Sequence, residues 1–200
     1  MISSPVMIRL SRLVDEMMDI FIDEVNRSHS LKKKNLDIGD IHPGFTREGH
    51  IQCLLFSGLR DRGYESMAEE NYFHSTDSSR QLDIAVWIHD IAKWLLLEVK
   101  PCSPLFGYQL PLEDAFKLRN DRVTDPRDRL RGVFAYGFRD PVDRDGFPEK
   151  YARLSHEMKA LDFQEIGIRY RPLEGTDFVA VQIGLWVTDV IEPLTCVTGE

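Results

Sequence analysis

Apolar residues in the first part of the chain recur with the spacing of one face of a helix. Between residues 8 and 26 they follow an i, i+3, i+4, i+7 pattern that consists of Leu10, Leu13, Val14, Met17, Met18, Phe21, Ile22 and Val25. This pattern predicts an amphipathic helix whose apolar side lies on a core or on a partner. The polar and basic segment 26–35 predicts a loop after it.

A second helical pattern follows near residue 46. Thr46 is a residue type that caps helices, Gly63 is one that ends them, and one side of the segment between them is marked by Ile51, Leu54, Leu55 and Leu59. Segment 65–74 then predicts a strand, because it lies between Gly63 and the turn-forming residues 75–80.

Two runs rich in strand-forming residues, 81–89 and 94–100, are separated by a short polar link. They predict a β-hairpin with its turn near residues 90–93. Beyond it the pattern predicts a helix from about Pro111, and then a strand, a helix and two strands at 132–140, 148–161, 164–173 and 177–187. The chain is therefore predicted to be an α/β (α+β) protein with a central mixed β-sheet flanked by helices.

Three charged residues interrupt the apolar runs of the predicted hairpin: Asp83, Glu98 and Lys100. Burying a charge without a partner is costly, so these residues need an explanation. Side chains alternate along a strand, which places Glu98 and Lys100 on one face, and hairpin pairing brings Asp83 opposite the far end of the second strand. Two converging carboxylates are hard oxygen ligands for Mg²⁺ or Mn²⁺, and Lys100 can orient a water or stabilise charge that develops on phosphorus.

These residues, together with Glu48 in the predicted helix before them, resemble the PD-(D/E)xK nuclease superfamily. The resemblance lies in the order of a helix acid (Glu48), an acid on the second strand (Asp83) and Glu98-Val99-Lys100 on the third strand. It implies a restriction-endonuclease-like core in which Glu48, Asp83 and Glu98 bind Mg²⁺ (or Mn²⁺) and Lys100 assists the hydrolysis of a phosphodiester. Leu82 stands where the pattern often has proline.

The expected organisation is a single domain over residues 1–200. Residues 1–45 form an N-terminal helical extension and loop, 46–122 carry the nuclease-like core motif, and 123–200 complete the sheet with further strands and a helix. The resemblance covers somewhat less than half of this length.

Basic residues gather after the predicted hairpin, where Lys117, Arg119 and Arg122 are the candidate contacts to nucleic acid. Aspartates alternate with these cations, so an ion-pair network is the simpler interpretation, and a path for a phosphate backbone is the alternative. Glu69 and Glu70 on the predicted first strand are further acids, one of which can face the site.

The net charge and the cysteine content exclude some classes of protein and of site. The formal net charge of -8 argues against a broad basic surface for nucleic acid. Three scattered cysteines predict neither a disulfide framework nor a zinc site, which favours the reducing cytoplasm, and no segment is apolar enough to predict a membrane span or an export signal.

Two hypotheses of different classes follow. The first is a Mg²⁺-dependent nuclease that hydrolyses DNA phosphodiester bonds in the cytoplasm. The second is a non-catalytic module with the same fold that binds a protein partner or forms a homodimer. A hydrolase of another phosphate ester is a third, and the form of any nucleic-acid substrate is left open.

Overall fold

The computed structural model describes seven stretches of the chain, residues 2–33, 48–71, 81–102, 109–120, 129–139, 147–173 and 180–189. Their α-helices are α1 (Ser4–Lys33), α3 (Glu48–Asp61), α4 (Gln109–Asn120) and α5 (Phe147–Ala160). The strands are β1 (Glu65–Asn71), β2 (Gln81–Ile88), β3 (Lys93–Pro101), β4 (Arg129–Arg139), β5 (Gln164–Pro172) and β6 (Ala180–Thr188), and the 3₁₀ turn η1 (His89–Ile91) lies between β2 and β3.

The strands form a six-stranded mixed sheet in the order β1-β2-β3-β4-β6-β5. Strands β3 and β4 are parallel, whereas every other neighbouring pair is antiparallel. A parallel pair needs a crossover connection, and α4 lies between β3 and β4 in the chain. The predicted mixed α/β class and its central mixed sheet are thereby confirmed.

The predicted hairpin is the part of the sheet that carries the charged residues. Strands β2 and β3 pair antiparallel from Ile88↔Lys93 to Ile84↔Leu97, with η1 as their connection. Trp87 and Trp94 are opposite one another, and their ring centroids lie 5.4 Å apart. This register places Asp83 just past the last paired residue, level with the far half of β3, as the sequence predicted.

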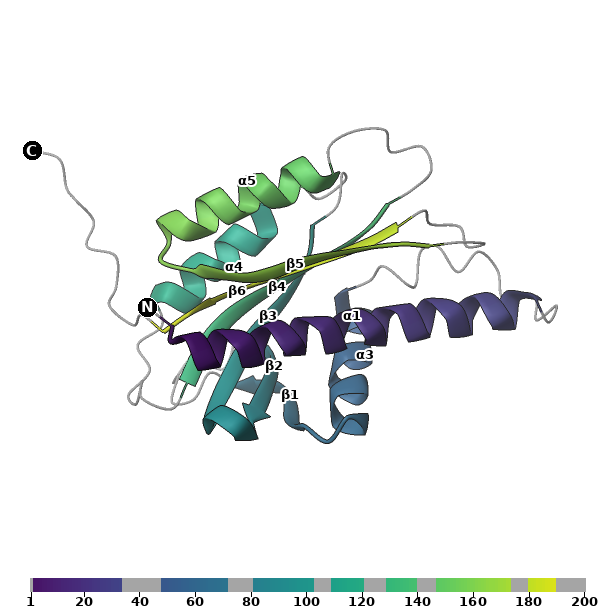
Figure 1. Cartoon of the computed structure of the whole chain (residues 1–200), viewed down its shortest axis with the longest axis horizontal. Coiled ribbons are helices and arrows are strands. Elements are labelled where there is room, and N and C mark those ends of the chain that lie inside the picture. The colour runs from purple at the N-terminus through teal and green to yellow at the C-terminus, as the bar shows by residue number, and fades with distance from the viewer. Residues whose placement is uncertain are drawn as a thin grey trace, which may run out of the picture.

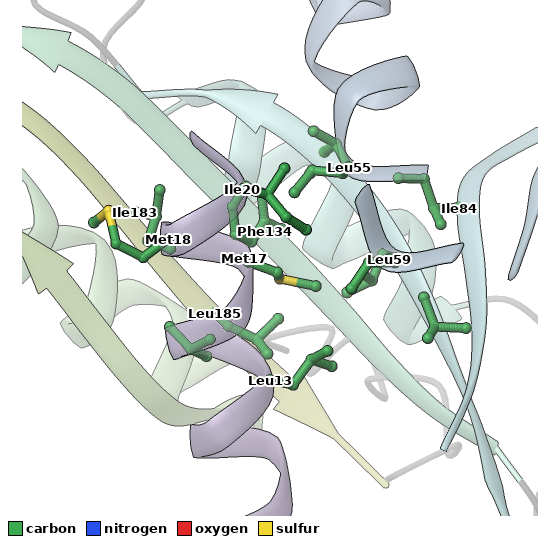
Figure 2. Close-up of a cluster of buried hydrophobic side chains, with 14 of the residues drawn as sticks. Leu13, Met17, Met18, Ile20, Leu55, Leu59, Ile84, Phe134, Ile183 and Leu185 are labelled. Carbon is green, nitrogen blue, oxygen red and sulfur yellow. The ribbon is translucent and has the colours of Figure 1, made fainter. Parts of the chain in front are cut away.

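One face of the sheet is covered by α1 and α3, and α4 and α5 cover the other (Figure 1). The apolar side of α1 is buried against the sheet, so the helix is part of the main core and not an extension beside it. Figure 2 shows this packing for Leu13, Met17, Met18 and Ile20 of α1, Leu55 and Leu59 of α3, and Ile84, Phe134, Ile183 and Leu185 of the sheet. A second cluster on the opposite face includes Leu96, Leu118, Tyr151, Leu154 and Trp186.

The predicted loop at 26–35 is wrong where the structure describes it, because α1 continues to Lys33. Segment 26–33 is polar but contains neither glycine nor proline, so nothing in it interrupts the helical hydrogen bonds. The predicted end of the next helix is confirmed: α3 ends at Asp61, and Gly63 has a positive φ of 87°. Thr46, its predicted cap, lies outside the described residues.

Replacing Phe21 by alanine tests the role of α1 in the core. The Phe21 side chain is fully buried, and its ring centroid lies 5.9–6.0 Å from those of Phe134, Tyr136 and Phe138. We expect Phe21→Ala to lower the free energy of unfolding by about 3–5 kcal/mol, measured by urea denaturation. Ile8 on the same helix is 58% exposed, so Ile8→Ala is the control and should change stability by no more than about 0.5 kcal/mol. Equal effects of the two substitutions would contradict the packing described for α1.

Candidate functional site

The site forms where β2 and β3 stop pairing. The β2–β3 register ends at the Ile84↔Leu97 pair. Beyond this pair, the Oδ2 of Asp83 accepts a 2.7 Å hydrogen bond from the backbone N–H of Val99. A side-chain acceptor has here replaced a backbone acceptor of the neighbouring strand. The carboxylate of Asp83 is thereby held beside the segment that carries Glu98 and Lys100.

The predicted alternation along β3 holds at this point. Leu97 and Val99 belong to the core beneath α1 and α3, whereas Leu96 belongs to the cluster beneath α4 and α5. Glu98 and Lys100 share the parity of Leu96, and the Nζ of Lys100 lies 4.0 Å from an Oε of Glu98. Glu98 is only 5% exposed, so its charge is largely removed from water.

Four carboxylates surround the ammonium group of Lys100. The Nζ atom lies 2.5 Å from Glu48 Oε1, 3.4 Å from Asp114 Oδ2 and 3.6 Å from Asp83 Oδ2, in addition to the Glu98 contact. The structure thus brings together the four predicted catalytic residues, Glu48, Asp83, Glu98 and Lys100, from one helix and two strands. Whether they bind metal or catalyse a reaction stays a prediction.

Glu48 reaches the cluster because it is the first residue of α3. Its Oε1 also accepts a 3.2 Å hydrogen bond from the Nε2 of Gln52, one turn further along the helix. An acidic residue in the first turn is favourable, since the helix dipole places partial positive charge there. Helix geometry and Gln52 therefore orient the carboxylate toward Lys100.

The cluster raises the pKa of Lys100. Burial of the amine alone acts to lower this pKa, but the hydrogen bond to Glu48 and the negative charges of Asp83, Asp114 and Glu48 outweigh burial. The pKa of Lys100 is therefore above its ordinary value of 10.5, and the side chain is a cation at neutral pH. Nearby Tyr136, on β4, has a raised pKa mainly because its hydroxyl is buried, with the charge of Glu48 as the next cause.

Asp114 on α4 is the residue that sequence reasoning missed. It is 3% exposed, and its Oδ1 lies 2.5 Å from the Nζ of Lys117 while its Oδ2 faces Lys100. A signal for it exists in the sequence: Asp114 lies on the same helical stripe as the buried residues Pro111, Ala115 and Leu118. An acid on an apolar stripe is a candidate for a buried partner of charge.

We call Glu48, Asp83, Glu98, Asp114, Lys100 and Lys117 the Lys100 cluster. Lysine side chains provide the counter-charge that the sequence analysis had assigned to a divalent cation. Among the described residues, no three His, Cys, Asp or Glu side chains are already arranged to hold a metal ion. Carboxylate oxygens are the ligand type that a hard cation prefers, and binding of such an ion by Glu48, Asp83 and Glu98 stays a prediction.

The basic residues suggested for nucleic acid have different surroundings. Lys117 has a side chain that is 66% exposed, and it lies at the edge of the cluster. Arg119 is only 4% exposed and its Nη2 lies 3.0 Å from Asp162, so it is a structural contact and not a group that a phosphate backbone can reach. Arg122 lies outside the described residues, as do the side chains of Glu69 and Glu70.

No protein-family model, no curated protein and no solved structure matches this chain. In the part of the chain that the structure describes, no helix combines the length and the apolar character needed to cross a membrane.

Replacing Lys100 by methionine tests the electrostatic role of its ammonium group. The change leaves four neighbouring carboxylates without their central cation, in a site whose side chains are 4–36% exposed. We expect Lys100→Met to lower the free energy of unfolding by about 1–3 kcal/mol, less than for a fully buried pair because water reaches part of the site. Denaturation of the Lys159→Met protein, which changes an exposed lysine on α5, gives the control.

The same variant has a defined pH dependence. Because the folded-state pKa of Lys100 is raised, its contribution to stability is fully present below the unfolded value of 10.5 and is lost as pH rises through the folded-state pKa. The stability difference between parent and Lys100→Met should therefore be constant between about pH 7 and pH 10 and shrink in more alkaline solution. A difference that already disappears at neutral pH would contradict this assignment.

Proposed function

We propose that the protein is a divalent-cation-dependent phosphodiesterase that hydrolyses DNA, with the Lys100 cluster as its active site. The observation that carries this proposal is the convergence of Glu48, Asp83 and Glu98 on the Nζ of Lys100, with distances of 2.5 to 4.0 Å. Hydrolysis of a phosphodiester needs carboxylates that bind a hard cation and a positive group close to the reacting phosphate. This cluster offers both.

Glu48, Asp83 and Glu98 are the residues that would hold Mg²⁺ (or Mn²⁺). When bound, such an ion polarises a phosphoryl oxygen and lowers the pKa of a coordinated water. The proposal rests on the donor chemistry, because these are oxygen ligands from separate elements that all lie within 4.0 Å of the Nζ of Lys100. An added cation would reduce the repulsion among the carboxylates.

The protein groups have separate roles in this proposal. The Val99 N–H fixes the carboxylate of Asp83, and Gln52 fixes that of Glu48. The ammonium group of Lys100 stabilises negative charge at the phosphate and orients the attacking water by hydrogen bonding.

The order of elements gives further support. The acid-bearing helix α3 is followed by three antiparallel strands, with Asp83 on the second strand and Glu98 and Lys100 on the third. This is the arrangement expected from the resemblance to PD-(D/E)xK nucleases. A restriction-endonuclease-like core is therefore part of the proposal. A cytoplasmic location is also part of it, because three scattered cysteines favour a reducing compartment.

The second candidate is a non-catalytic module that binds a protein partner or forms a homodimer. It is favoured by the finding that Lys100 and Lys117 already give the carboxylates counter-charge, and by a net charge of -8, which disfavours unassisted binding to DNA. In this reading the Lys100 cluster joins α3, β2, β3 and α4 and has no chemical role.

Cleavage assays test the nuclease proposal. The parent protein with Mg²⁺ or Mn²⁺ should cleave a panel of double-stranded and single-stranded DNA, and Asp83→Asn and Lys100→Met should each reduce the rate by about 10²-fold or more. Asp61→Asn, which changes an exposed acid at the other end of α3, should cleave at the parental rate. Circular dichroism must show that every variant is folded. Cleavage by folded Asp83→Asn at the parental rate would contradict the proposal.

Metal binding separates the two candidates without a substrate. Calorimetric titration with Mg²⁺ should give saturable heat for the parent, and a Glu98→Gln change should weaken the affinity by at least about tenfold because a carboxylate ligand is lost. The Asp61→Asn protein should bind as the parent does. An absence of saturable heat from the folded parent would favour the interaction module.

A further inference from the structure

Asp114 on α4 contacts two lysines at once, Lys117 on its own helix and Lys100 on β3. Its Oδ1 lies 2.5 Å from the Nζ of Lys117, one turn further along α4, and its Oδ2 lies 3.4 Å from the Nζ of Lys100. Only 4% of the Asp114 side chain is exposed. Both oxygens of a buried carboxylate are thus engaged by cations.

The position of α4 determines from which helix Asp114 approaches the ammonium group of Lys100. Helix α4 lies on the face of the sheet opposite α3, which carries Glu48 (Figure 1). The ammonium of Lys100 therefore contacts carboxylates from two helices that cover opposite faces of the sheet, Glu48 of α3 at 2.5 Å and Asp114 of α4 at 3.4 Å. Without Asp114, the remaining attraction would come from Glu48, Asp83 and Glu98, the three residues proposed to hold the cation.

We propose that Asp114 is a positioning residue that holds the ammonium of Lys100 toward α4, so that Glu48, Asp83 and Glu98 do not draw it fully into the space between them. Lys117 supports this role because it neutralises the second oxygen of Asp114 and fixes the carboxylate on its helix. The inference rests on the proposed function. It adds to that function a residue on α4 that acts through Lys100 and touches neither substrate nor cation.

Acylation of lysine amines tests the hold of Asp114 on Lys100 without metal or DNA. The full chain is treated with limiting acetic anhydride, and modification of Lys100 is measured by mass spectrometry relative to exposed Lys159. Asp114→Asn keeps the shape of the side chain but removes its charge, and it should increase modification of Lys100 by about threefold or more because one of the charges that hold the amine is lost. Glu113→Gln makes the same chemical change at the adjacent exposed position of α4 and should have no effect.

Unchanged modification of Lys100 in folded Asp114→Asn would overturn the proposal. Asp114→Glu retains the carboxylate and should keep Lys100 at its parental modification level; equal labelling of Asp114→Glu and Asp114→Asn would also overturn it. If Asp114→Asn does not fold, Asp114→Ser provides the same comparison with Asp114→Glu.

Steady-state cleavage gives a second readout. Asp114→Asn should lower kcat by about tenfold or more, with KM for DNA and the half-saturating Mg²⁺ concentration changed by less than about twofold. A different outcome is a large rise in the half-saturating Mg²⁺ concentration of Asp114→Asn, with acylation of Lys100 at the parental level. This result would identify Asp114 as a cation ligand and would overturn the positioning role. A parent that cleaves no DNA would defeat the proposed function, whereas the acylation result would still decide whether Asp114 holds Lys100.

Discussion

The attraction between the Lys100 ammonium and four carboxylates connects the four elements that carry the candidate site, α3, β2, β3 and α4. Glu98, Asp114 and Asp83 have side chains that are at most 15% exposed, and removing such groups from water is unfavourable unless charge and hydrogen bonds compensate. Lys100 lies within 4.0 Å of each of them and of Glu48. It therefore links α3 on one face of the sheet with α4 on the other through the end of β3.

The backbone of β2 and β3 determines where these charged side chains lie. The β2–β3 ladder ends at Ile84↔Leu97, and the hydrogen bond from Val99 N–H to Asp83 holds the carboxylate where the strands separate. Strand parity directs Glu98 and Lys100 to the face that carries Leu96, whereas Leu97 and Val99 lie in the apolar core beneath α1 and α3. A shift of β3 by one residue would place Glu98 and Lys100 in that apolar core, so the register is fixed by the cost of burying their charges there. The apolar core thus determines the positions of the charges.

The sequence predicts those parts of the site that depend on local geometry. The Glu98–Lys100 parity follows from strand pleating, and the approach of Asp83 follows from a short hairpin link, so both emerge from residues 81–100 alone. The helical stripe of Pro111, Ala115 and Leu118 indicates that Asp114 is buried, but its contact with Lys100 depends on how α4 packs over β3 and β4 after a parallel crossover, which no local pattern specifies. The sequence predicts the end of α1 wrongly for a related reason: polarity at residues 26–33 indicates exposure to water, but it does not end a helix that lacks glycine and proline there.

The charges of the Lys100 cluster bear on the choice between a nuclease and a non-catalytic interaction module. An ion cluster whose only role is structural is least costly when its charges cancel, because each excess buried charge must be stabilised by something else. In the Lys100 cluster the ammonium of Lys100 lies among the carboxylates of Glu48, Asp83, Glu98 and Asp114, and Lys117, whose side chain is 66% exposed, contacts Asp114 at the edge. The chain as a whole is also acidic, with a net charge of -8.

A polyanion such as DNA would therefore be repelled from this site unless a cation bound with it. Binding of the cation and of the substrate would then have to be coupled. An interaction module would face no such requirement, and its carboxylates would be free to attract a basic partner directly.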